Sequence, residues 1–216
     1  MHIHDLMVRN LRAIRQFEVS DLDSFVVIAG QNGSGKSCVF DAIRLLKSVY
    51  GGYAANEYHQ WFGEFAINLG DRRSVHKLFR DPRLPIEICA SLSFSPSEIA
   101  YLNTETETLV QALAFQEVTG QPVDYWTFSA IAMATQLRGF GPQIAETASR
   151  LARDVRAALA EGSRHELALT ILPTGEMRTA ECKPAEVAFQ AYEPTKLGVI
   201  EYHSASRSFS RQQVGG

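Results

Sequence analysis

The stretch Phe25–Lys47, FVVIAGQNGSGKSCVFDAIRLLK, combines the three signals that decide the fold. Its first five residues are apolar and mostly β-branched, which is typical of a buried strand. The run from Gly30 to Gly35 then provides a flexible, glycine-rich backbone. From Val39 onward, apolar residues recur at spacings of three and four, which predicts an amphipathic helix. The stretch is therefore expected to fold as strand, turn and helix.

The turn contains the pattern G-x-x-x-x-G-K-S, which fits a polyphosphate. Successive backbone N–H groups can surround a phosphate only where side chains leave room, and glycine has no Cβ. Lys36 would neutralise the β- and γ-phosphates, the Ser37 hydroxyl would bind Mg²⁺, and the helix N-terminus would add partial positive charge. The pattern predicts a site for ATP and Mg²⁺ formed by Gly30, Asn32, Gly33, Ser34, Gly35, Lys36, Ser37 and Cys38.

Composition sets wider limits on function. The 216 residues suffice for one large domain or two small ones, and the net charge of −3 leaves any nucleic-acid contact to a local patch. The three cysteines and six histidines are scattered without zinc-site spacing, which favours a reducing, cytoplasmic setting. No apolar run is long enough to cross a bilayer, so we expect a soluble protein.

Two further strands are expected before the phosphate loop. Residues 3–11 and 14–19 alternate loosely between polar and apolar side chains, and together they suggest an antiparallel meander. In simple nucleotide kinases the strand of the phosphate loop usually comes first. The order in this chain therefore argues against a small-molecule P-loop kinase. Such a kinase remains the alternative function, from a different class of enzyme.

Residues 3–46 resemble the N-terminal lobe of ABC-type ATPase heads of the SMC, RecF and OLD (overcoming lysogenization defect) group. The matching pieces are VRNLRAI, GQNGSGKS and FDAIRLL. The resemblance implies a mixed α/β P-loop fold and an ATPase whose two heads sandwich ATP in a homodimer or higher oligomer. It further implies a role in DNA repair, chromosome maintenance or defence against foreign DNA, with DNA and a nuclease domain or subunit as possible partners.

The resemblance also suggests residues outside the loop. Arg12 falls where such heads carry a basic residue close to the nucleotide, although an exposed turn arginine is an equal alternative. IEYHSASRSFSRQQ resembles the segment whose glutamine reaches Mg²⁺ and the attacking water, which makes Gln212 and Gln213 candidates. The alternative for both glutamines is a polar chain terminus.

The rest of the chain is expected to complete one lobe. After the strand–loop–helix unit of residues 1–50, residues 51–70 are interpreted as an irregular insertion. Residues 71–83 form the most basic segment, either a contact for a phosphate backbone or a solvated charged helix. A helical insertion at about 96–162, broken near 103–108, precedes returning strands within 163–216, the last at 197–202.

Two catalytic elements of such an ATPase are not visible in the sequence. Hydrolysis needs an apolar strand ending in Asp-Glu and a signature turn resembling L-S-G-G-Q, and the residues 197–201, LGVIE, lack the aspartate. We therefore expect the chain to be the N-terminal part of a larger protein that hydrolyses ATP only when completed. A non-hydrolysing, nucleotide-switched assembly module is a third interpretation.

Overall fold

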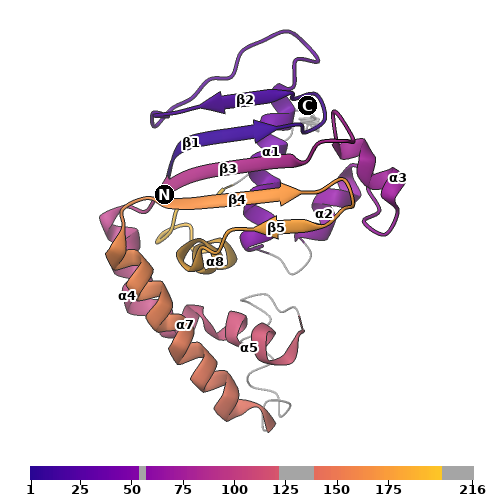
Figure 1. Ribbon diagram of the computed structural model, residues 1–216. Coiled ribbons are helices and arrows are strands. Elements are labelled where there is room, and N and C mark those ends of the chain that lie inside the picture. Colours follow the sequence, from indigo (N-terminus) through magenta and orange to yellow (C-terminus); the bar gives the residue numbers. More distant parts are fainter. Residues whose placement is uncertain (54–56, 122–138, 201–216) are drawn as a thin grey trace, which may run out of the picture.

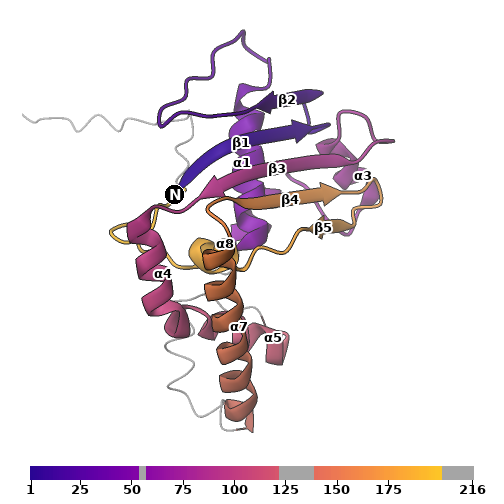
Figure 2. The ribbon, with the colours of Figure 1, turned by 60° about the vertical axis from the view of Figure 1, so that its left-hand side comes forward.

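A five-stranded antiparallel sheet organises the computed structural model, which describes residues 1–53, 57–121 and 139–200 (Figures 1 and 2). The strand order is β2-β1-β3-β4-β5, and each neighbouring pair is antiparallel. The expected meander before the phosphate loop is confirmed by the pairing of β1 with β2. The strands are β1 (His2–Arg9), β2 (Gln16–Val19), β3 (Ile86–Ser93), β4 (His165–Ile171) and β5 (Met177–Thr179).

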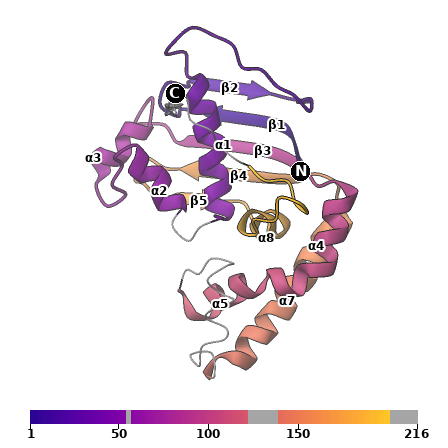
Figure 3. The same cartoon turned by 180° about the vertical axis from the view of Figure 1, so that it is seen from behind.

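One face of the sheet is buried beneath the helix α1 (Lys36–Tyr50) (Figure 3). Leu6 and Val8 alternate with half-buried neighbours along β1, as expected for a strand with one covered face. Ala42 and Leu45 belong to the apolar side of α1 and are fully buried. None of the described helices covers the opposite face of the sheet (Figures 1 and 3).

Short helices flank α1, and two of them were missed from the sequence. Residues 51–70, expected to be irregular, contain α2 (Glu57–Glu64), whose Trp61 and Phe62 are almost fully buried. Near the chain's end lies α8 (Lys183–Gln190). Helices of eight residues show too little periodicity for prediction, and their stability comes from packing. The basic segment forms α3 (Arg72–Val75) and the 3₁₀ helix η1 (His76–Leu78).

A helical arm projects from one end of the sheet (Figures 1 and 2). It consists of α4 (Pro96–Leu109), α5 (Gln111–Thr119) and α7 (Gly141–Glu161). The break expected near residues 103–108 is absent, because α4 continues through these residues to Leu109, and the hydroxyls of Thr104 and Thr106 bond to backbone carbonyls one turn earlier. Residues 122–138 of the expected helical insertion lie outside the described residues. No helix in the described ranges could span a membrane.

Two expected strands are not formed. Residues Phe25–Ala29 and the described part of the last predicted strand, 197–200, have no strand assignment. A strand needs a neighbour to accept and donate its backbone hydrogen bonds, and neither segment has one among the described residues. The strand expected before the phosphate loop is therefore not present, and the described part of the chain holds a mixed α/β fold with an antiparallel sheet.

The buried ring of His165 should make stability sensitive to acid. It lies against Phe94, with ring centroids 5.4 Å apart, and this burial lowers the pKa of His165. A lowered folded-state pKa means that the unfolded chain binds more protons, so stability falls as the pH drops below about 6.5, the ordinary histidine value. Urea denaturation between pH 5 and 8 should show this slope, and His165→Gln should reduce it. Equal slopes for both proteins would contradict the assignment.

Candidate nucleotide-binding site

The loop before α1 adopts a conformation that requires glycine at two positions. Gly33 and Gly35 have φ angles of 80° and 94°, in the left-handed region that side chains rarely adopt. A Cβ on Gly35 would lie 3.3 Å from Cγ1 of Ile14, and a Cβ on Gly30 would lie 2.9 Å from Oγ of Ser34. The loop therefore bends tightly against residues 13–14 of the turn that follows β1.

This bend leaves a series of backbone N–H groups without acceptors. Among the described residues, Ser34 alone of residues 32–38 donates a backbone hydrogen bond, to the carbonyl of Gln31 at 3.2 Å. The first turn of α1 has no side-chain cap and no acidic residue. Unbonded N–H groups at a helix N-terminus after a glycine loop form a concave donor surface for an anion. The groups belong to Asn32, Gly33, Gly35, Lys36, Ser37 and Cys38.

Lys36 and Ser37 place the required charge and hydroxyl at this donor surface. The ammonium of Lys36 donates to the carbonyls of Gly30 and Gln31, at 2.5 and 2.7 Å, and so is held across the mouth of the loop. Ser37 is exposed, and its hydroxyl has no hydrogen-bond partner within the described ranges. The set could hold a magnesium-bound polyphosphate, and Ser37 would then be the protein ligand to Mg²⁺. The side chain of Cys38 is buried, so only its backbone N–H is available.

Arg12 lies beside α1 and forms an ion pair with a residue of this helix. Its guanidinium donates to a carboxylate oxygen of Asp41 at 3.2 Å and stacks 4.3 Å from the ring centroid of Phe65. Asp41 does not face solvent: this residue is only 5% exposed, and its backbone carbonyl accepts a hydrogen bond from the indole of Trp61. Burial raises the pKa of Asp41, while Arg12 opposes that shift. A contact between Arg12 and nucleotide stays a prediction.

Asn10, which the sequence analysis did not single out, joins the basic segment to the turn behind the loop. Its buried amide nitrogen donates to the carbonyls of Asp81, Leu84 and Pro85, and its oxygen accepts from the N–H of Asp81. Its φ of 59° is a conformation that asparagine tolerates, so an Asn between strand and turn was the available signal. Nearby, Arg80 donates to the carbonyl of Ala13 at 2.9 Å.

Some side chains of the basic segment thus form hydrogen bonds within the protein. Arg83 forms two hydrogen bonds to the carboxylate of Asp81, at 2.9 and 2.8 Å, and this partner lowers the pKa of Asp81 to about 2. Arg72, Arg73 and Lys77 have no ion-pair partner in the part of the chain that the structure describes. These three side chains remain candidates for a phosphate backbone.

Gln212 and Gln213 lie outside the described residues, so their predicted roles stay predictions. Within the described ranges, no group of three histidine, cysteine or acidic side chains could hold a metal ion. Comparison of the chain with family models, with curated proteins and with solved structures found no match. The features that favour a nucleotide site are therefore the glycines, the unbonded N–H groups, Lys36 and Ser37.

Proposed function

We propose that this chain is the ATP-binding lobe of an ABC/OLD-like ATPase. The observation that carries the proposal is the series of six unbonded N–H groups that ends in the first turn of α1, with the ammonium of Lys36 held across it. Such an arrangement binds the phosphate chain through backbone donors and charge together. Mg²⁺ would be held by the Ser37 hydroxyl and by phosphate oxygens.

The class of ATPase is proposed from the resemblance of residues 3–46 to SMC, RecF and OLD heads. The antiparallel pairing of β1 and β2 before the loop supports this class over a small-molecule kinase. In this proposal, ATP joins two heads into a dimer, and the work is DNA repair, chromosome maintenance or defence against foreign DNA. The free basic side chains on α3 and η1 are the local candidates for DNA contact.

Calorimetric titration of the 1–216 chain with nucleotides tests the proposed site. Because the donors surround phosphates, MgATP should bind at least about tenfold more tightly than AMP, which corresponds to about 1.4 kcal/mol. Ser37→Ala should reduce the gain in affinity that Mg²⁺ provides, since the variant removes the hydroxyl ligand. Equal affinity for ATP and AMP, or binding that Mg²⁺ does not affect, would contradict the assignment.

A second candidate is a nucleotide-switched assembly module that binds ATP without hydrolysing it. It is favoured by one observation: the acidic side chain nearest in sequence to the loop, Asp41, is buried in an ion pair with Arg12. Among the described residues, no acidic cluster is available to hold a metal ion. Steady phosphate release from ATP by the purified chain would exclude this candidate, whereas binding without release would favour it.

A further inference from the structure

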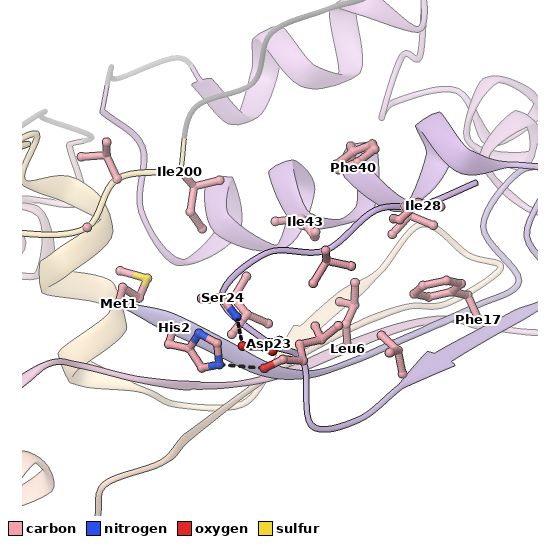
Figure 4. A pocket seen from close by; sticks show the side chains of 17 residues that line it. Met1, His2, Leu6, Phe17, Asp23, Ser24, Ile28, Phe40, Ile43 and Ile200 are labelled. Atoms are coloured by element: carbon pink, nitrogen blue, oxygen red, sulfur yellow. Dashed lines mark hydrogen bonds between the residues drawn. The ribbon is translucent and has the colours of Figure 1, made fainter. Parts of the chain in front are cut away.

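The two faces of the sheet differ in the side chains that they carry. On the face covered by α1, a groove of about 420 Å³ is lined mainly by apolar side chains, among them Leu6, Phe17 and Ile43 (Figure 4). None of the described helices covers the opposite, open face, which carries the other alternate residues of each strand, such as Asp5 and Met7 in β1 (Figures 1 and 3). A small pocket of about 80 Å³ lies on this open face.

A row of three polar side chains crosses the open face at this pocket. Ser91 of β3 lies between Asp5 of β1 and Glu166 of β4, because the antiparallel register places both residues directly opposite it. Directly opposed residues have Cβ atoms about 4.5–5.5 Å apart, so one small group can reach all three side chains. All three residues line the pocket. The row therefore presents a hydroxyl between two carboxylates.

The hydroxyl of Ser91 is buried without a partner. Ser91 is only 3% exposed, whereas Glu87 and Cys89, its neighbours on the same face of β3, are partly exposed. Its Oγ forms no hydrogen bond with any described residue. A buried hydroxyl that stays unbonded costs free energy, so such groups are rare in folded proteins and indicate a missing partner. A ligand in the pocket can supply that partner.

The charge of the pocket favours a cation. Glu166 has no ion-pair partner in the described part of the chain, and Asp5 pairs only with the half-exposed Arg164, at 3.4 Å. Glu18 of β2 adds a third carboxylate, and among the described residues no lysine or arginine lines the pocket. The pKa of Cys89, which also lines it, is raised by burial and then by the charges of the neighbouring glutamates. Negative charge is thus concentrated at this point of the open face.

The set of acceptors fits an ammonium group better than a metal ion. Within the described ranges, no three acidic, histidine or cysteine side chains lie close enough together to hold a metal. A primary ammonium has three N–H donors, one for each of Asp5, Ser91 and Glu166. Met7 and Cys89 lie opposite each other beside this row and offer an apolar surface to the methylene groups that carry the ammonium.

We propose that the pocket on the open face is a binding site for a primary alkylammonium group, carried either by a lysine side chain of another polypeptide or by a free polyamine. The Ser91 hydroxyl accepts one N–H of this group, and the carboxylates of Asp5 and Glu166 accept the others and neutralise its charge. The site lies on the opposite side of the sheet from α1. It therefore goes beyond the proposed nucleotide function and does not depend on it.

Nuclear magnetic resonance titration of the ¹⁵N-labelled 1–216 chain with n-butylammonium tests the proposal. The amide signals of the three-residue row should shift and saturate in the millimolar range. Tetramethylammonium has the same charge but no N–H donor, so it should bind at least about tenfold more weakly. Ser91→Ala and Glu166→Gln should each weaken n-butylammonium binding about tenfold or more, because each removes a hydrogen bond to a charged group. Glu176→Gln, which changes an exposed glutamate paired with Arg178, is the matched control and should bind like the wild type.

Two further probes distinguish the sources of the ammonium group. Tighter binding of spermidine than of Nα-acetyl-lysine-methylamide would assign the site to a free polyamine, and the reverse order would assign it to a lysine side chain. Either order supports an alkylammonium site.

Three results would overturn the proposal. The first is the absence of a saturable shift with n-butylammonium, and the second is equal binding of n-butylammonium and tetramethylammonium. The third is a lower midpoint of urea unfolding for Ser91→Ala than for the wild type, because that loss would mean that the hydroxyl already has a partner within the folded chain. Since Lys36→Ala should bind n-butylammonium like the wild type, failure of this site and failure of the nucleotide site are distinguishable.

Discussion

Replacement of Lys36 by alanine should weaken binding of MgATP about 10- to 100-fold, because a hydrogen bond to a charged group contributes about 1.5–3 kcal/mol. Two losses combine in this variant. The phosphates lose their cationic partner, and the carbonyls of Gly30 and Gln31 lose the ammonium that now joins them at 2.5 and 2.7 Å. Calorimetry at two salt concentrations measures both the affinity and the charge dependence.

The salt dependence separates the electrostatic loss from a change in loop shape. Since salt screens charge, wild-type affinity should fall as salt rises, and Lys36→Ala should respond less. Lys77→Ala is the matched control, because Lys77 is an exposed lysine without an ion pair among the described residues. It should bind ATP like the wild type. Unchanged affinity for MgATP in Lys36→Ala would show that Lys36 does not contact the phosphates. The proposed site would then lack the cationic group that the proposal requires.

The parts of this molecule that could be predicted from sequence are those fixed by nearby residues. The glycine loop and α1 are adjacent in the sequence. The glycines that indicate the loop and the apolar periodicity that indicates the helix are both local signals. The antiparallel strands β1 and β2 are likewise joined by a short turn. For the same reason the position of the glycine loop directly before α1 could be predicted, whereas nucleotide binding at this loop stays a prediction.

The errors occur where the deciding partner is distant or outside the described residues. Phe25–Ala29 has strong strand propensity, yet a strand also needs neighbours, and propensity does not report whether they are present. The burial of Asp41 could not be predicted from the sequence, because its partner, Arg12, lies 29 residues earlier in the chain. No local pattern reveals such an ion pair, and the aromatic ring of Phe65 that covers Arg12 is equally remote in sequence.

The buried ion pair of Lys47 could not be predicted from the sequence for the same reason. Its disruption should produce the largest loss of stability. Lys47 is 2% exposed, and its ammonium contacts both carboxylate oxygens of Glu57 at 2.6 Å. It also lies 3.3 Å from the ring centroid of Tyr53, whose backbone N–H donates to Glu57. Burial lowers the pKa of Lys47, and Glu57 opposes this shift.

Glu57→Gln should lower the free energy of unfolding by about 3 kcal/mol, because removing one member of a buried pair leaves an uncompensated charge. Urea denaturation measures the loss. Glu64→Gln is the matched control, since Glu64 pairs with Arg44 between the same two helices but is half exposed. The loss there should stay below about 1 kcal/mol. Equal losses in the two variants would mean that burial does not decide the strength of these pairs.

The double variant Lys47→Met/Glu57→Gln shows why Glu57→Gln loses stability. The cause is either the loss of the attraction between Lys47 and Glu57 or the unpaired, buried charge that remains on Lys47. Methionine fills a similar space without a charge, so the double variant should recover most of the stability that Glu57→Gln loses. The pH dependence gives an independent check. Without Glu57 the pKa of Lys47 should fall further, so the unfolded chain binds more protons and the stability of Glu57→Gln should rise with pH up to about 10.4, the ordinary lysine value. A double variant as unstable as Glu57→Gln, together with a flat pH profile for Glu57→Gln itself, would instead assign the loss to packing around Tyr53.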